Sequence, residues 1–324
     1  MAEDIEVKEV RSDKELMDFI KFPWEIYKND PYWVPPLIRD VKVLLSQKNA
    51  FWQHAEKELF LARRDGRIVG RIAAIIDHNY INFHKEKMGF FGFFESLEDY
   101  TIAEKLLNKA KEWLKGKEME KMAGPMNPST NDEVGFLLEG YDASPYILMT
   151  YNPKYYIGFM EKYGLVKEMD YFAYLMEVDK GPLERLEKVA EKIREKNPNI
   201  KIRQARLKDW NNEVENVRQI YNNAWENNWG FVPWTKEEFY TEAMKLKPFL
   251  VPGTIPFAEV GGKVVGMLVT VPNYNEVTKR MKGKLNPWTI LKFLWYRRKI
   301  TTQRLPIFGV LKEYQKRGIE TILM

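Results

Sequence analysis

The sequence contains no cysteine, which limits the chemistry open to the protein. Disulfide bonds, thiolate nucleophiles and cysteine-based zinc sites are excluded. Only three histidines are present, His54, His78 and His84, and no carboxylate pattern typical of a metal site surrounds them. The G-x-S-x-G motif of serine hydrolases is absent as well. We therefore expect no bound metal and no Ser-His-Asp hydrolase.

Long apolar runs and one-sided charge are also missing. No run approaches the about 18 apolar residues of a membrane-spanning helix, and the charged start MAEDIEVKEV is unlike a secretory signal. The 51 basic and 46 acidic residues leave a net charge of +5, too small to indicate a nucleic-acid partner by itself, and no basic run could follow a phosphate backbone. The sequence predicts a cytoplasmic protein with no membrane span and no nucleic-acid partner.

What the sequence does contain is an internal repeat. With 324 residues, 45% of them hydrophobic and 30% charged, the chain is expected to be globular with about two domains. Residues 60–75 and 257–271 both consist of an apolar strand, a glycine turn and a second apolar strand, which is the pattern of a β-hairpin. The two segments align when Gly66 is placed on Gly262. A chance match of two aliphatic hairpins is the alternative.

The segments around the hairpins repeat in the same order, which is strand, helix, helix, hairpin, strand and helix. In the first half the elements beside the hairpin are expected at 5–10, 13–29, 37–48, 89–95 and 100–117, and in the second half at 200–205, 208–227, 235–247 and 305–311. The first half then continues with a polar loop, a helix at 152–165 and a closing strand at 171–178.

The repeat predicts an α/β protein with α+β layering and two similar domains, each a mixed, mainly antiparallel central sheet flanked by helices. We place the first domain at 1–180, a linking helix at 181–199 and the second domain at 200–324. The first half continues far beyond the point that corresponds to the last residues of the second half. We therefore expect the second domain to be incomplete and the chain to be truncated at its C-terminal end.

Several motifs carry a family resemblance. The hairpins D-G-R-I-V-G and G-G-K-V-V-G, with V-L-K-E-Y-Q-K-R-G-I-E at 310–320, resemble the GNAT superfamily of acyl-CoA-dependent N-acyltransferases. The stretches N-D-P-Y-W-V-P-P-L (29–37) and G-P-M-N-P-S-T-N-D-E (124–133) look like a bacterial family of tandem GNAT-like proteins, mostly uncharacterised. The resemblance implies acetyl-CoA or a longer acyl-CoA as co-substrate and a small-molecule amine or an amino-acid-like compound as acceptor.

The resemblance also implies a cofactor loop in the second half. The superfamily pattern Q/R-x-x-G-x-G/A falls on 315–320, where a glycine permits close backbone approach and successive amides can hold an anion. Glu320 departs from the pattern, which has Gly or Ala there, and an ordinary basic helix start is the alternative. The acyl-CoA contacts implied are Val310, Leu311, Gln315, Lys316, Arg317, Gly318 and Ile319.

The first half departs further from the superfamily. Its corresponding loop carries Glu95, Glu98 and Asp99, which would repel a diphosphate, and Ser96 is expected to be the N-cap of the next helix. In the helix at 152–165, Met160 stands where active relatives have a proton-donating tyrosine. Tyr156, one turn earlier, is a candidate substitute or a core residue. We expect this domain to be degenerate and not to bind CoA in the usual way.

The substrate-binding candidates come from two loops. The loop after 124 offers polar side chains that would bind a polar ligand or form turns and caps: Asn127, Ser129, Thr130, Asn131 and Asp132. The loop at 227–234 offers Trp229 and Phe231 as an apolar wall, with core packing as the alternative. Glu259 and Glu226 are the candidate bases that would take the proton of the amine.

The segment 274–300 is an insertion without a counterpart in the first half. Trp288, Ile290, Leu291, Leu294 and Trp295 predict a helix with an apolar face flanked by bases. This helix would cover an acyl chain, make weak contact with a membrane surface through 286–299, or dock on the other domain. We expect an N-acyltransferase that transfers an acetyl or longer acyl group. The alternative is a non-catalytic ligand-binding or scaffolding protein, and no oligomeric state is predicted.

Overall fold

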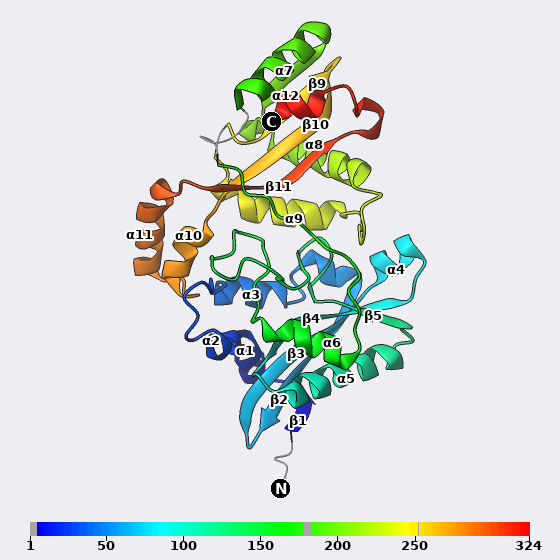
Figure 1. Cartoon of the computed structure of the whole chain (residues 1–324), viewed down its shortest axis with the longest axis vertical. Helices are drawn as coiled ribbons and strands as arrows, with labels where there is room; N and C mark the ends of the chain where they lie inside the picture. Colours follow the sequence, from blue (N-terminus) through cyan, green and yellow to red (C-terminus); the bar gives the residue numbers. More distant parts are fainter. Residues whose placement is uncertain (1–4, 178–182, 252) are drawn as a thin grey trace. The chain divides into compact units, whose positions relative to one another are not determined.

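The chain divides into two compact units. The computed structural model (Figure 1) describes residues 5–177, 183–251 and 253–324. Unit 1 consists of Met1–Val166 and Tyr274–Ile300, and unit 2 of Lys167–Asn273 and Thr301–Met324. The units therefore differ from the expected domains, because the helix placed between the domains belongs to unit 2 and the insertion belongs to unit 1. Residues 178–182 of the expected boundary lie outside the described residues.

Unit 1 is built on a five-stranded sheet with the order β1-β2-β3-β4-β5. Neighbouring strands from β1 to β4 are antiparallel, whereas β5 runs parallel to β4. The β2–β3 turn places Asp65 and Gly66 at φ of 49° and 76°, a conformation that favours glycine. The strands span Ile5–Glu9 (β1), Ala55–Arg64 (β2), Arg67–Asp77 (β3), Met88–Ser96 (β4) and Lys121–Ala123 (β5).

Helix α5 supplies much of the core of unit 1. Ile102, Leu106, Leu107, Ala110 and Leu114 lie on one face of this helix and are fully or almost fully buried. Gly70 on β3 lets the helix approach, since a Cβ there would lie 2.6 Å from Leu106 Cδ1. The helices before the insertion are α1 (Asp13–Lys21), α2 (Pro23–Ile26), α3 (Ile38–Leu44), α4 (His78–His84), α5 (Tyr100–Gly116) and α6 (Tyr155–Tyr163), with η1 at Ala50–Gln53 and the short strands β6 (Met126–Asn127) and β7 (Glu133–Val134).

The insertion packs within unit 1. This agrees with one of the three expectations, which was that its helix docks on the other domain. A Cβ on Gly283 would lie 2.3 Å from Trp24 Cζ2, and Ile38 N donates to Gly283 O at 3.1 Å. Lys279 Nζ donates to Ser144 Oγ at 2.8 Å. The elements of the insertion are α10 (Asn275–Thr278), η4 (Lys279–Met281), α11 (Pro287–Tyr296) and η5 (Arg297–Lys299).

Unit 2 repeats the sheet of unit 1 without a fifth strand among its described residues. Its antiparallel strands have the order β11-β10-β9-β8, which corresponds to β4-β3-β2-β1. The strands are β8 (Ile200–Gln204), β9 (Pro256–Val260), β10 (Lys263–Pro272) and β11 (Gln303–Val310). The helices are α7 (Leu183–Lys196), α8 (Trp210–Ala224), α9 (Lys236–Leu246) and α12 (Ile319–Leu323), with η2 at Leu207–Asp209, η3 at Lys247–Phe249 and η6 at Lys312–Tyr314.

The register confirms the internal repeat. Leu97 N donates to Val69 O at 3.0 Å in unit 1, and Leu311 N donates to Val265 O at 2.8 Å in unit 2. Gly70 pairs with Ser96, and its counterpart Gly266 pairs with Val310. Like Gly70, Gly266 faces the helix that follows the edge strand, since a Cβ there would lie 3.1 Å from Ile319. Ser96 and Val310 are therefore equivalent positions.

Two local predictions were wrong. Residues 171–177 of the predicted closing strand form no strand, and Phe172, Tyr174 and Leu175 are at least three-quarters exposed. The N-cap of α5 is Asp99, whose side chain accepts from Thr101 N, and not Ser96, which is buried at the end of β4. Asp99 also pairs with Arg64, and this ion pair lowers the pKa of its carboxyl.

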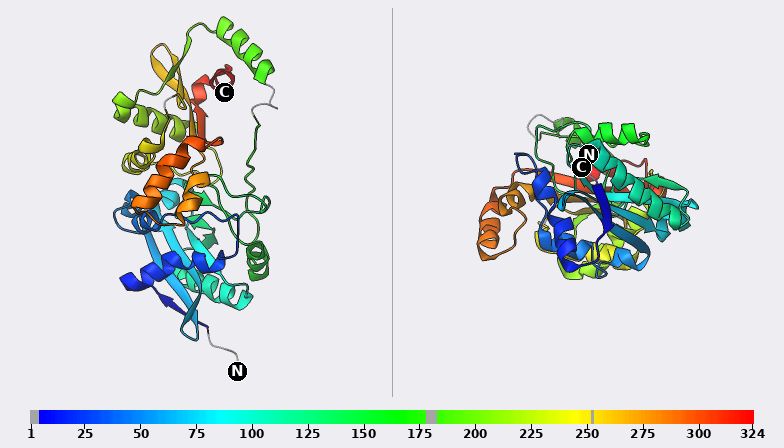
Figure 2. Two further views of the ribbon diagram at one scale, coloured as in Figure 1. Left: turned by 90° about the vertical axis from the view of Figure 1, so that its left-hand side faces the viewer. Right: turned by 90° about the horizontal axis from the view of Figure 1, so that it is seen from below.

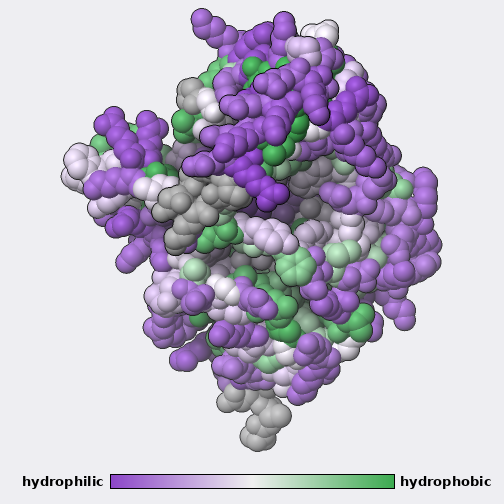
Figure 3. Space-filling view, turned by 45° about the horizontal axis from the view of Figure 1, so that its top comes forward, coloured by the Kyte–Doolittle hydropathy of each residue, from purple (hydrophilic) through white to green (hydrophobic). Residues whose placement is uncertain are grey.

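The surface of the protein is mainly hydrophilic, whereas its core is apolar. Hydrophilic residues cover most of the face shown in Figure 3, and hydrophobic residues reach the surface in smaller groups. Among the described residues, no helix has the length and the apolar character needed to cross a bilayer. Figure 2 shows α11, drawn in orange, on the outside of unit 1.

Candidate functional site

The outer edge of β11 is the first part of the candidate site. Leu311 bonds to β10 through its N–H, and Gly309 lies opposite Met267. Because alternate residues of an antiparallel strand point to opposite neighbours, the backbone groups of Phe308 and Val310 point away from β10. Phe308 O accepts from Trp225 Nε1, and Val310 O accepts from Gln315 Nε2, both at 3.0 Å. Within the described residues, neither outward N–H has an acceptor.

The loop after β11 contains most of the predicted acyl-CoA contacts. Gln315, Lys316 and Arg317 are exposed, and Lys316 and Gly318 have φ of 61° and 80°. A Cβ on Gly318 would lie 2.7 Å from Ile193 Cδ1 of α7, so packing alone already requires a glycine there. Lys316 and Arg317 thus place two exposed positive charges beside the end of the strand edge.

Two of the predicted contacts face the protein and not the edge. Leu311 is buried, and its N–H is used by Val265 O. Ile319 is completely buried against Gly266 of β10. Of the predicted strand residues, Val310 is therefore the one whose N–H points to the outer edge.

Aromatic side chains of α8 and the loop after it lie beside this edge. Trp225 donates to β11, and its ring lies 4.7 Å from that of Tyr221, which in turn lies 5.9 Å from Phe231. Phe231 is buried, whereas Trp229 is half-buried and donates to Glu168 Oε1 at 3.4 Å. The sequence prediction missed Trp225, although its position four residues after Tyr221 already places both rings on one face of a helix.

The two candidate bases have different surroundings. Glu226 follows Trp225 and pairs with Lys312, the second residue after Val310. Glu259 lies on β9, which β10 separates from β11, and its carboxylate accepts from Arg203 Nε. Arg203 also pairs with the buried Glu213 at 2.6 Å. The structure therefore brings Glu226, but not Glu259, to the end of β11.

The corresponding edge in unit 1 is occupied by the unit's own chain. Beyond Phe90, β4 separates from β5, and Phe93 N donates to Asn127 Oδ1 at 2.6 Å. A Cβ on Gly92 would lie 1.8 Å from Met126 O, so the loop after β5 lies directly against β4. Asn127, predicted to bind substrate, thus satisfies a backbone donor of β4.

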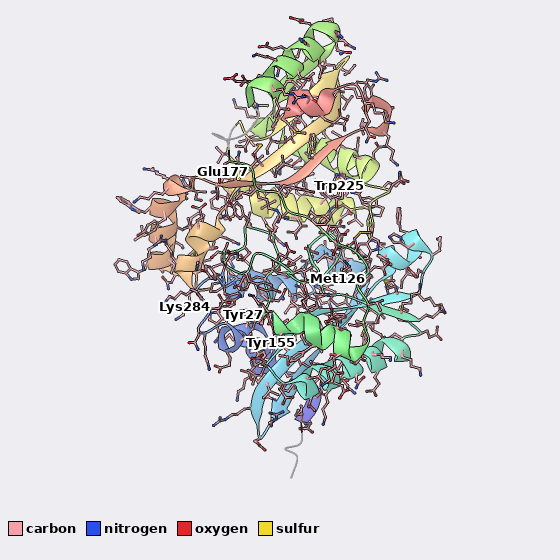
Figure 4. All side chains as sticks on the ribbon, viewed as in Figure 1. Tyr27, Met126, Tyr155, Glu177, Trp225 and Lys284 are labelled. Atoms are coloured by element: carbon pink, nitrogen blue, oxygen red, sulfur yellow. The ribbon has the colours of Figure 1, made fainter. Side chains whose placement is uncertain are left out.

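Helix α6 fills the end of the same edge. Ser96 N donates to the hydroxyl of Tyr156 at 2.8 Å, and Tyr155 donates to Ser96 O at 2.7 Å. Tyr156 is completely buried and donates to Glu95 Oε2 at 2.7 Å. Figure 4 shows Tyr155 and Met126 in unit 1 and Trp225 in unit 2. Both backbone groups of Ser96 are therefore satisfied within the protein.

Glu95 is the centre of a buried polar cluster. Tyr27 also donates to Glu95 Oε2, at 3.1 Å, and Arg71 Nη2 lies 3.7 Å from Glu95 Oε1. Burial raises the pKa of the Glu95 carboxyl, and the charge of Arg71 opposes this change. Burial, with the nearby charge of Glu95, raises the pKa of Tyr156 well above its ordinary value. The sequence prediction missed Tyr27 and Arg71, which have no local motif.

Side chains of the polar loop of unit 1 form hydrogen bonds within the loop. Ser129 Oγ donates to Asp132 Oδ2 at 2.6 Å and accepts from Asn131 N at 3.1 Å. Thr130 Oγ1 is buried and has no hydrogen-bond partner among the described residues. These bonds fit turn formation, and a ligand contact of this loop stays a prediction.

Comparison with known proteins gives the family. No protein-family model matches the chain. A bacterial ceramide synthase from Caulobacter vibrioides is 34% identical over 317 residues, which cover 96% of this chain and 82% of that protein. The chain belongs to the family of this ceramide synthase. Protein YghO of Escherichia coli K12 is a further relative, 33% identical over 313 residues, which cover 95% of this chain and 79% of YghO.

A solved structure gives the fold of this member of the ceramide synthase family. A tandem GNAT protein from the clavulanic acid biosynthesis pathway matches 99% of the chain with a TM-score of 0.51 and 11% identity, and 83% of that protein is covered. The resemblance to tandem GNAT proteins is therefore confirmed as a fold. The protein is a member of a GNAT-fold acyltransferase family.

Proposed function

We propose that this protein is an acyl-CoA-dependent N-acyltransferase whose acceptor is the amine of a long-chain amino alcohol. The proposal rests on the 34% identity to a ceramide synthase over 96% of the chain. A ceramide is the amide of a fatty acid and a long-chain amino alcohol, so its synthesis forms one amide bond. The tandem GNAT fold, found in acyl-CoA-dependent enzymes, supports the same chemistry.

The edge of β11 suits the arm of acyl-CoA that carries the thioester. This arm contains two amide groups, which can add to a sheet edge as a further strand does. The N–H groups of Phe308 and Val310 are suitable donors, because they point outward and lack acceptors in the described structure. Lys316 and Arg317, shortly after the strand, are exposed and would attract the diphosphate. We assign the acyl-CoA to unit 2 for these reasons.

The reaction needs one acceptor for the proton of the amine. The amine nitrogen attacks the thioester carbonyl carbon, so that a C–N bond forms, the C–S bond breaks and the thiolate leaves and becomes protonated. We propose Glu226 as the base, since it lies at the end of β11. Glu259 is held by Arg203 on a strand that does not adjoin β11. Tyr156, whose hydroxyl is used by Glu95 and Ser96, is assigned no proton transfer.

A thiol assay tests the reaction directly. Because the chain has no cysteine, free CoA is the only thiol that a colorimetric thiol reagent would detect. We expect release of CoA when palmitoyl-CoA and a long-chain amino alcohol are both present, with the amide product identified by mass spectrometry. Acetyl-CoA and ethanolamine serve as short-chain controls. If folded protein releases no CoA with any pair and no acyl-CoA raises its melting temperature, the non-catalytic alternative holds.

Two variants locate the site. Val310→Pro removes one N–H, and we expect the KM for acyl-CoA to rise about tenfold, the effect of one lost hydrogen bond. Val310→Ala keeps the amide and controls for the side chain. Glu226→Gln should lower kcat at least about 100-fold, whereas Glu259→Gln should leave kcat within a few-fold of the wild type. Equal effects of the two glutamine variants would contradict our choice of base.

A further inference from the structure

Helix α11 has one face packed against unit 1 and another face that is open. The packed face consists of Thr289, Phe293 and Tyr296, which are half-buried. Phe293 stacks on Tyr274 with ring centroids 5.6 Å apart, and the Arg280 guanidinium lies 4.5 Å from the centroid of the Tyr296 ring. These contacts fix the rotation of the helix and thereby decide which side chains point outward.

The open face is composed of large apolar side chains. At about 100° per residue, these positions cover nearly half of the helix circumference. Isolated exposed apolar residues are common, but a contiguous group on one helix marks a binding surface. The exposed fractions are 75% for Trp288, 42% for Ile290, 59% for Leu291, 44% for Leu294 and 68% for Trp295.

Positive charge surrounds this face without any negative charge in the same stretch. Between Glu276 and Glu313 the sequence has no acidic residue. Figure 4 labels Lys284, one of the bases of the insertion, in unit 1. Among the described residues, no carboxylate forms an ion pair with the exposed bases before, within and after α11, which are Lys282, Lys284, Lys292, Arg297, Arg298 and Lys299.

We propose that α11 docks this protein on the surface of a bilayer that contains anionic lipids, with the helix lying in the plane of the interface. Leucine and isoleucine side chains would enter the acyl region, and the tryptophans would lie at the level of the headgroups. The bases at both ends would contact anionic headgroups. At ten residues, α11 is too short to span the bilayer. This inference does not depend on the proposed reaction.

Neither alternative surface explains both features. A protein partner would account for the apolar face, but not for bases on both sides of it with no acid between them. A nucleic acid would account for the bases, but it offers little to five exposed aliphatic and indole side chains. A bilayer with anionic headgroups offers an apolar layer next to a negatively charged layer, so a helix lying at their boundary contacts both.

Vesicle binding tests the proposal on the full chain. We expect sedimentation with vesicles of phosphatidylcholine in which about one lipid in three is phosphatidylglycerol, and at least about tenfold weaker binding to phosphatidylcholine alone. High salt should weaken the binding. Phospholipids brominated on their acyl chains should quench tryptophan fluorescence in the wild type, and less in a Trp288→Phe/Trp295→Phe variant.

Matched variants separate the two contributions. Leu291→Glu/Leu294→Glu should abolish binding to both vesicle types, whereas Leu138→Glu/Val166→Glu, at exposed positions elsewhere in unit 1, should not. Arg297→Gln/Arg298→Gln/Lys299→Gln should weaken binding by about fivefold for each base. The control is Lys14→Gln/Lys111→Gln/Lys115→Gln, three exposed bases of α1 and α5. Circular dichroism confirms that each variant is folded.

Three results would overturn the proposal. The first is that folded wild-type protein binds neither vesicle type. The second is that the glutamate pair leaves binding unchanged while salt abolishes it, which would identify a general polyanion surface. The third is that the glutamate pair converts a dimer into a monomer in light scattering while vesicle binding is absent, which would identify an interface between two copies of the chain.

Discussion

Ser96 and Val310 occupy equivalent positions in two sheets of the same topology, yet their backbone groups have different partners. In unit 1, Tyr156 accepts from Ser96 N and Tyr155 donates to Ser96 O. In unit 2, Gln315 donates to Val310 O, and Val310 N has no acceptor among the described residues. The outer side of β4 is therefore closed by the unit's own side chains, whereas the outer edge of β11 is open to a ligand or a further strand.

The difference shows how one fold separates stability from binding. Buried backbone groups must form hydrogen bonds, and in unit 1 the chain after β5 supplies them through Asn127 and helix α6. Once the unit's own side chains fill this edge, the end of β4 beyond Phe90 has no place for a further strand. An edge strand with unpaired N–H groups is a place where another chain or a ligand can add.

The largest effect on the free energy of unfolding should come from adding a single methyl group at Gly92, on the closed side of β4. In Gly92→Ala the new Cβ would lie 1.8 Å from Met126 O, so the loop must move, and we expect a loss of about 3 kcal/mol in the free energy of unfolding. Gly158→Ala on α6 is the control. No atom lies within 4 Å of its Cβ position, so the better helix propensity should stabilise by about 0.5–1 kcal/mol. Denaturant titration measures both changes. If Gly92→Ala lowers the free energy of unfolding by no more than an ordinary surface substitution does, the closed edge is refuted.

A smaller effect is expected from removing one hydroxyl of α6. Tyr156→Phe leaves Ser96 N–H without an acceptor and removes one donor to Glu95, so we expect a loss of about 2 kcal/mol in denaturant unfolding. Tyr163→Phe is the matched variant on the same helix. Its hydroxyl donates to Asn108 Oδ1 at 2.8 Å at the surface, where water can replace the bond. Equal costs for the two variants would show that the Tyr156 network does not hold the edge.

The smallest effect is expected at the open edge. Val310→Pro removes an N–H that has no partner in the described structure, and edge strands accept proline where the N–H points outward. Relative to Val310→Ala, we therefore expect a change in unfolding free energy below about 1 kcal/mol. Ser96→Pro, at the equivalent position, should cost clearly more. The comparison fails if the two proline variants are equally destabilised, or if the Val310 amide exchanges its hydrogen as slowly as that of Ser96.

Local patterns were sufficient for the main strands and helices of both sheets, but not at residues 171–177, where the predicted closing strand does not form. The glycine turns, the apolar face of α5 and the repeated element order could be read from residue spacing, because helices and strands have fixed periods. The same information failed where partners come from distant segments. Asp99, and not Ser96, caps α5, because the bonds that Ser96 makes to α6 keep it in β4.

The candidate site could be located only in part. The sequence pointed to Val310 and to the basic loop after it, but Leu311 and Ile319 proved to be core residues. Trp225 entered the site because the end of α8 lies against β11. Glu226 and Glu259 had the same standing as candidates, and only the strand order separated them.

The sequence by itself determined the duplicated α/β frame, its turns and the amphipathic character of the insertion, since these depend on neighbours along the chain. The tertiary structure decided which edge is closed, which carboxylate lies beside the open edge and which face of α11 is exposed. Each of these depends on contacts between segments far apart in the sequence. Periodicity does not encode such contacts, because the free energy of burying a polar or apolar group depends on what packs against it.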